Sequence, residues 1–184
     1  MEEYFPAVLT PVKWSNDEFM KDENSYELCS RLAYIVNCEA PVLQSTLIRR
    51  LLQSCGVSRG GARIQTRALS LVDSMGLSYT MQGDERLYWR TGQDPQQFTG
   101  FRVGGSDKRE PRDIPVIEAA NAVCRVMENQ IGLPMDGLVR ETARILGYAR
   151  AGSNVLTVVG AAIRLAQSQG KIVINEDNYV SLPQ

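Results

Sequence analysis

Apolar residues recur every three or four positions in three stretches of the first half of the chain, which is the period of an amphipathic helix. The first stretch covers about residues 25–36, the second begins at Ser45, and the third runs over about 61–75. The apolar positions are Leu28, Leu32, Ile35, Val36, Leu47, Ile48, Leu51, Leu52, Ile64, Ala68, Leu71, Val72 and Met75. The period then changes to two on both sides of the Gly-Asp pair at 83–84, which predicts a β-hairpin.

The second half of the chain repeats this order of patterns. It predicts a helix that begins near Asp113, a second helix that is capped by Asp136 and ended by Gly147, and a third helix over about 153–169. Alternating residues over 171–182 predict a second hairpin. The order helix, helix, helix, hairpin therefore occurs twice.

The repeat is also visible residue by residue. The segment GVSRGGARI, from Gly56 to Ile64, aligns without gaps on GYARAGSNV, from Gly147 to Val155. The third helix of the first copy is expected to be about one turn shorter than that of the second. We therefore expect a mainly α chain with small β-hairpins, in the α+β class, built of two tandem winged-helix (helix-turn-helix) repeats.

These patterns divide the chain into four segments. Residues 1–23 show no helical period and are expected to form an extended N-terminal arm. The first winged-helix repeat would occupy 24–90 and the second 113–184. Between them, 91–112 is rich in glycine, proline and charged residues and is expected to be a linker, with some aromatic residues docked on a domain.

Charge is distributed unevenly along the chain, although its formal total is only −1. Residues 1–39 contain eight acids and three bases, whereas 40–72 contain five arginines and no acid. Those five are Arg49, Arg50, Arg59, Arg63 and Arg67. A basic helix that follows a glycine turn is typical of helix-turn-helix proteins that bind nucleic acid. An arginine face that is simply solvated remains the alternative.

Some of the candidate arginines have an arginine at the aligned position of the other copy, and others do not. Arg59 has an arginine in register, Arg150, so both are candidate contacts that could equally brace the turn. Arg49 or Arg50 could bind phosphate, or could pair with the acidic first helix of the same repeat. Arg63 and Arg67 lie one helical turn apart and have no arginine in register, so they are the sharper candidates for phosphate contacts.

Several kinds of chemistry are disfavoured by composition. The chain has no histidine, which excludes Ser-His-Asp and Cys-His catalysis and most catalytic zinc sites. Its four cysteines form no C-x-x-C pair, and no pair of carboxylates lies in a recognisable apolar pocket. No apolar run is long enough to span a bilayer. We therefore expect a cytoplasmic protein that is not an enzyme and has no metal, cofactor or membrane partner.

An ordered series of short motifs gives the chain a resemblance to a known family. The motifs are Glu39-Ala-Pro-Val, Arg49-Arg50, Gly56 to Ile64, Leu87-Tyr-Trp, Gly92-Gln-Asp-Pro, Phe101-Arg, Arg112-Asp-Ile-Pro and Gly147-Tyr-x-Arg-x-Gly. Together they extend from about Tyr4 to Leu182. The chain resembles a domain of unknown function at the C-terminus of large bacterial proteins related to superfamily I DNA helicases, which also carry a restriction-endonuclease-like domain.

The resemblance implies an accessory domain, because these 184 residues contain neither helicase ATP-binding motifs nor nuclease carboxylates. From the sequence we expect a non-catalytic module that binds nucleic acid, most simply DNA with low specificity, and serves parent helicase and nuclease domains. The alternative is a module for protein–protein interaction that docks on the helicase core or a partner without contacting DNA.

Overall fold

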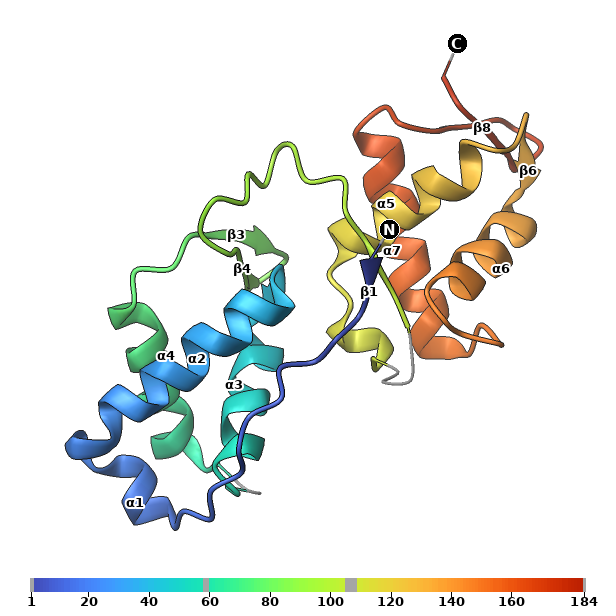
Figure 1. Cartoon of the computed structure of the whole chain (residues 1–184). Coiled ribbons are helices and arrows are strands. Elements are labelled where there is room, and N and C mark those ends of the chain that lie inside the picture. Colours follow the sequence, from blue (N-terminus) through green and yellow to red (C-terminus); the bar gives the residue numbers. More distant parts are fainter. Residues whose placement is uncertain (1, 58–59, 105–108, 184) are drawn as a thin grey trace. The chain divides into compact units, whose positions relative to one another are not determined.

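The structure is a computed structural model of the chain and describes residues 2–57, 60–104 and 109–183. It divides into two compact units (Figure 1). The N-terminal unit is Phe5–Gln97, and the C-terminal unit joins Met1–Tyr4 to Phe98–Gln184. The chain therefore passes between the units twice, so its first residues fold with its last ones.

The N-terminal unit combines helices with one small sheet. In chain order its elements are α1 (Asn16–Met20), a 3-10 turn (Asp22–Asn24), α2 (Ser25–Glu39), β2 (Val42–Leu43), α3 (Gln44–Ser54), α4 (Ala62–Ser74), β3 (Tyr79–Gln82) and β4 (Glu85–Tyr88). The sheet is antiparallel, with β4 between β2 and β3. The apolar stripes of α2, α3 and α4 form the core together with Tyr88 of the sheet, because each helix must bury its apolar side.

The C-terminal unit has the same kinds of element. They are β1 (Glu2–Glu3), β5 (Arg102–Val103), a 3-10 turn (Pro111–Asp113), α5 (Val116–Met127), β6 (Leu133–Pro134), α6 (Met135–Ile145), α7 (Ser153–Ser168), β7 (Val173–Ile174) and β8 (Tyr179–Ser181). An antiparallel sheet places β8 between β6 and β7, and a separate pair joins β1 to β5 in parallel. Helix α7 packs on α5 at the centre of this unit.

Both units therefore follow one order: helix, strand, helix, helix, strand, strand, with the last strand in the middle of the sheet. The mixture of helices with small antiparallel sheets confirms the predicted α+β class. Helix α4 has 13 residues and α7 has 16, so the helix of the first copy is shorter by three residues, as the sequence predicted.

The turn between the second and third helices is built in the same way in both units. Gly56 lies two residues past the end of α3 and has φ of 72°, and Gly147 lies two residues past the end of α6 and has φ of 92°. The amide of Val57 donates to the carbonyl of Leu52, and that of Tyr148 donates to Ala143. This six-residue closure is a Schellman motif, which needs a left-handed residue that glycine adopts without strain.

Two expectations at the edges of the repeats need correction. The N-terminal arm is not extended throughout, because Ser15 caps α1 through a capping box with Glu18. The predicted linker is also more ordered than expected: besides Phe101, whose docking was expected, Arg102 is buried and lies in β5. Residues 105–108 of that segment lie outside the described residues.

A third correction concerns the cap of α6. Asp136 was expected to be the capping residue, but it lies inside the first turn of the helix, and the residue before the helix is Pro134. The side chain of Pro134 has no oxygen to accept a hydrogen bond, and no side-chain capping bond occurs at this helix start. Asp136 can still interact favourably with the helix dipole from the first turn.

A buried ionic cluster holds the segment before α5 in place. Glu118 of α5 accepts hydrogen bonds from Arg102 at 2.6 Å and from Arg109 at 2.8 Å, and all three side chains are buried. The Arg109 guanidinium also lies over the ring of Tyr4, 4.7 Å from its centre. The hydroxyl of Tyr148 donates to the carbonyl of Arg109 at 2.7 Å. The cluster thus joins β1, β5, α5 and the turn before α7.

Candidate functional site

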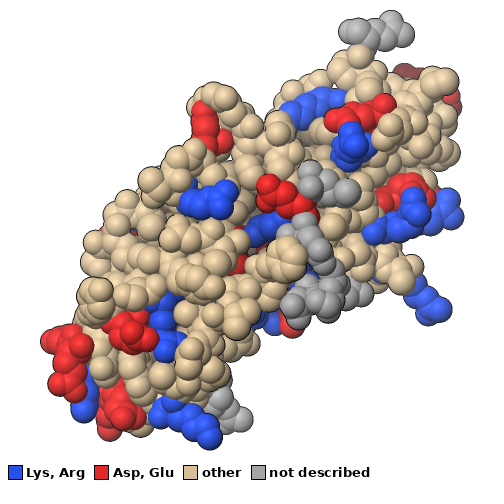
Figure 2. Space-filling model, in the orientation of Figure 1, with Lys and Arg blue, Asp and Glu red and all other residues tan. Residues whose placement is uncertain are grey.

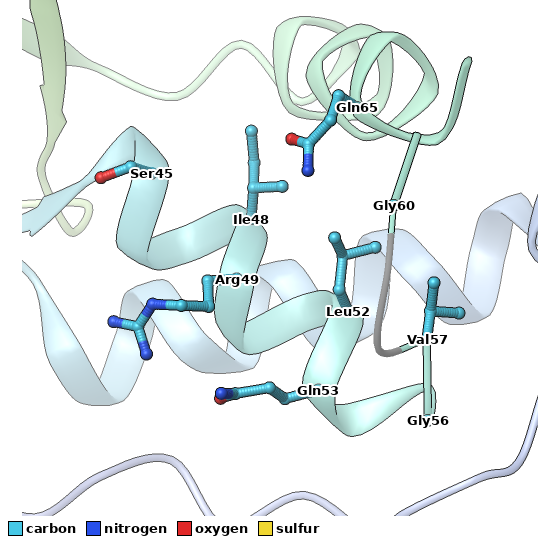
Figure 3. Close-up of a pocket in the computed structure, with 9 residues that line it drawn as sticks. All are labelled: Ser45, Ile48, Arg49, Leu52, Gln53, Gly56, Val57, Gly60 and Gln65. Atoms are coloured by element: carbon cyan, nitrogen blue, oxygen red, sulfur yellow. The ribbon is translucent and has the colours of Figure 1, made fainter. Parts of the chain in front are cut away.

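A groove lies between α3 and α4 in the N-terminal unit, beside the glycine turn. Its volume is about 720 Å³. Its lining residues are Ser45, Ile48, Arg49, Leu52, Gln53, Gly56, Val57, Gly60 and Gln65. Figure 3 shows Ile48 and Leu52 directed to the side where Gln65 of α4 lies, whereas Arg49 and Gln53 project elsewhere from α3. The groove is therefore apolar where the helices meet and basic at one margin.

The structure corrects the expectation that Arg67 faces solvent or phosphate. Its guanidinium donates to the carbonyls of Phe19 at 3.1 Å and Lys21 at 2.8 Å, at the C-terminal end of α1. It also donates to the Ser25 hydroxyl and pairs with Asp22 at 3.1 Å. Only 15% of the Arg67 side chain is exposed. Arg67 therefore fastens α1 to the flank of α4, and its hydrogen-bonding capacity is largely used within the unit.

The adjacent arginines on α3 also lie partly within the unit. Nε of Arg50 lies 3.4 Å from the carboxylate of Glu39, which is buried at the end of α2 and also accepts a bond from the amide of Ala7. Arg50 thus takes the intramolecular of its two predicted roles. Arg49 is half-buried at the margin of the groove.

Arg63 is the predicted contact in this unit that lies at the surface. It is exposed in the first turn of α4, and no ion pair or hydrogen bond of its side chain occurs among the described residues. Beside it is a hollow of about 440 Å³ that Thr66, Ser70 and Met20 also line. Arg59, another predicted contact, lies outside the described residues.

In the C-terminal unit, α6, α7 and the turn between them carry four exposed arginines, and three of these are candidate contacts. Arg150 was predicted and lies in the turn before α7, while Arg140 of α6 and Arg164 of α7 were not among the predicted contacts. None of the three side chains makes an ion pair or hydrogen bond within the described part of the chain. By contrast, Arg144 pairs with Glu141 at 2.8 Å one turn away. Helix α7 contains no acidic residue.

The tips of both hairpins are acidic. Asp84 is exposed in the turn between β3 and β4, and Glu176 and Asp177 are exposed in the turn between β7 and β8. Glu85 accepts a hydrogen bond from the amide of Ser45 at 2.6 Å. Carboxylates repel phosphate groups, so these tips are unsuited to contact with a nucleic-acid backbone. On the face shown in Figure 2, basic and acidic side chains are interspersed.

Within the described ranges, no group of three or more His, Cys, Asp or Glu side chains is arranged to hold a metal ion. The four cysteines are unpaired thiols. No helix of the described chain is long and apolar enough to cross a membrane.

Sequence reasoning missed the ionic cluster around Glu118 and the arginine Arg164, and it left Arg140 out of the candidate contacts although Arg140 is in register with Arg49. Arg109 stands in a run of charged and small residues that resembles a solvated linker, and nothing local marks it as buried. Arg164 could have been found from the repeat: the gap-free alignment of the copies places it opposite Asp73, so it reverses the charge of that position.

Comparison with protein-family models gives a match over residues 17–66. The matched family is described as a protein of unknown function (DUF3320). The match runs from α1 through α2 and α3 into the start of α4, so it includes Arg49, Arg50, Arg59 and Arg63 but ends one residue before Arg67. It supports the predicted resemblance to an uncharacterised domain. Comparison with curated proteins gives no match.

Proposed function

We propose that the chain consists of two winged-helix repeats that form a non-catalytic, nucleic-acid-binding accessory module. The proposal is supported by the order helix, strand, helix, helix, strand, strand, with the last strand central, which is typical of winged helices and occurs in both units. In line with the resemblance described above, the module would serve a helicase- and nuclease-related protein in the cytoplasm.

One observation supports this proposal above the others: both units place exposed arginines on their last two helices or in the turn between them, and these side chains make no ion pair or hydrogen bond among the described residues. These are Arg63 in the N-terminal unit and Arg140, Arg150 and Arg164 in the C-terminal unit. An arginine fork binds phosphate oxygens in pairs, which suits such side chains to a nucleic-acid backbone. The acidic hairpin tips confine this contact to the helices.

Salt dependence of binding tests the proposal. Four arginines that each neutralise one phosphate give a slope of log K against log salt of about −3.6. Affinity for a fluorescein-labelled 20-base-pair DNA should therefore fall about 150-fold between 50 and 200 mM salt, as measured by fluorescence anisotropy. Absence of binding at 50 mM salt, or a slope near zero, would contradict the proposal.

A protein-interaction module is the second candidate, and the pairing of Arg50 with Glu39 and of Arg67 with Asp22 favours it. Acids from the first 39 residues thus cover part of the arginine face of the N-terminal unit. On this alternative the arginines would contact an acidic protein surface of the parent helicase. Binding to the isolated helicase-related core, with no affinity for nucleic acid at low salt, would support it over the first candidate.

A further inference from the structure

The two copies of the third helix differ in the surface they present, although they share one fold. Helix α7 buries Val155, Val159, Ala162, Ile163 and Ala166 against its unit. The opposite side, about half a turn away in the 3.6-residue period, carries Ser153, Thr157, Ala161 and Arg164. Ser153, Thr157 and Arg164 are exposed and Ala161 is half-buried.

The side chain of Arg164 lies along α7. Nη1 of Arg164 is 3.6 Å from the position that a Cβ atom would take at Gly160, one turn earlier. Arg164 thus reaches back toward the middle of α7, and Arg150 stands before its first residue. Because α7 has no acid of its own, nothing on the helix opposes an approaching phosphate.

Helix α4 is less suited to the same contact. Asp73 occupies the position that Arg164 has in α7 when the copies are aligned without gaps, and it forms an ion pair with Arg86 of β4. The flank of α4 is occupied by the end of α1, which Arg67 fastens there. If α4 entered a DNA groove that is wide enough for one helix, the DNA would collide with α1 and would be repelled by the Asp73 carboxylate.

The chemistry of the α7 surface also selects the kind of nucleic acid. Neither α6 nor α7 contains an aromatic residue, and Tyr148 between them is buried, so the surface has no platform on which unpaired bases could stack. The major groove of B-form DNA, about 12 Å wide, admits a helix. The major groove of A-form RNA is deep and narrow and does not.

We propose that α7 of the C-terminal unit, and not α4, is the helix that enters the major groove of duplex DNA, with Arg164 on the groove side and Arg150 and Arg140 on flanking phosphates. This inference rests on the proposed function and assigns its main contact to one repeat. Arg63 of α4 then contributes less to the affinity than the arginines of the C-terminal unit do.

Anisotropy titrations with three labelled probes test it: a 20-base-pair DNA duplex, one of its strands, and the RNA duplex of the same sequence. The wild-type chain is expected to bind the DNA duplex at least about tenfold more tightly than the other two probes. The double variant Arg150→Ala/Arg164→Ala should weaken duplex binding by about tenfold or more, and Arg63→Ala by less than about threefold. Arg125→Ala, which removes a surface arginine of α5 that is ion-paired with Glu128, is the matched control and should bind as wild type.

A second variant, Ala161→Glu, places a carboxylate in the middle of the same side without removing an arginine, and it should weaken duplex binding to a similar extent. Unchanged circular dichroism confirms that each variant is folded. Duplex binding that survives both α7 changes, or a larger loss from Arg63→Ala, overturns the assignment to α7 while the proposed function stands. Equal binding of the three probes overturns the assignment to duplex DNA, and no binding of any probe overturns both proposals.

Discussion

Arginines in similar sequence surroundings have different structural roles in this chain. Arg63 and Arg67 are one turn apart on α4, yet the first is exposed and the second donates to two backbone carbonyls, a hydroxyl and a carboxylate. Removal of the Arg67 guanidinium would leave these acceptors without their charge-assisted hydrogen bonds, which destabilises the fold. Arg67 is therefore a stabilising residue, and Arg63 is available for contact with another molecule.

Replacement of Arg67 with alanine should lower the free energy of unfolding of the N-terminal unit by about 2 to 3 kcal/mol, because several hydrogen bonds to a charged donor are lost. Arg63→Ala is the control and should change it by less than about 0.5 kcal/mol. Urea titration followed by tryptophan fluorescence measures this unit selectively, since both tryptophans, Trp14 and Trp89, belong to it. Equal stability of the two variants would contradict the role assigned to Arg67.

The sequence alone could not separate these two arginines. The partners of Arg67 lie 42 to 48 residues earlier in the chain, and helical period reports only which side of its own helix a residue occupies. The prediction was correct for Arg63 as an exposed side chain and wrong for Arg67. The same limit applies to Arg109, whose burial depends on Glu118 and Tyr4 from separate elements.

At the scale of elements, the longer helices and both hairpins can be predicted from local pattern, because the apolar period and the glycine positions that define each of them lie within the same short segment. The two-residue strands β1 and β5 could not be predicted in this way, since they pair residues 100 positions apart. The turn after α3 is the element on which both local and distant constraints act. Gly56 has a left-handed φ, and a Cβ atom there would lie 2.8 Å from the carbonyl oxygen of Val12.

Gly56→Ala should therefore cost more than the left-handed strain alone. Gly76→Ala is a matched control, because Gly76 also has a positive φ, 61°, but open space around its Cβ position. We expect about 1 kcal/mol of destabilisation for Gly76→Ala from the backbone strain and at least about 1 kcal/mol more for Gly56→Ala from the added contact. Urea titration followed by tryptophan fluorescence measures the free energy of unfolding of both variants. Equal destabilisation would mean that the segment around Val12 moves away from residue 56 without loss of stability.

At the scale of the whole molecule, the chain passes twice between its units, and the buried cluster around Glu118 holds the returning segment. Burial by itself raises the pKa of Glu118, but the charges and hydrogen bonds of Arg102 and Arg109 outweigh this and lower it from 4.5 to about 2. A carboxyl with a lowered folded-state pKa stabilises the protein above its unfolded-state pKa and loses that contribution as pH falls.

The C-terminal unit should therefore lose stability as pH falls from about 4.5 toward 2. Glu118→Gln should lower its stability at pH 7 by about 3 to 5 kcal/mol, because two buried guanidinium groups lose their counter-charge, and should abolish this part of the pH dependence. Thermal unfolding followed by circular dichroism measures both effects, and unchanged tryptophan fluorescence would place the loss in the C-terminal unit. Glu128→Gln, at an exposed ion pair, is the control and should leave both properties unchanged.

On the proposed function, the exposed arginines of the last two helices and of the turn between them, which have no partner among the described residues, bind DNA. The most direct measurement compares the affinity for duplex DNA at 50 mM salt of two multiple variants. One replaces Arg63, Arg140, Arg150 and Arg164 with alanine, and the other replaces the ion-paired surface arginines Arg112, Arg125 and Arg144. The account predicts a loss of about 100-fold or more for the first and less than about fivefold for the second, whereas equal losses, or none in either, would contradict it.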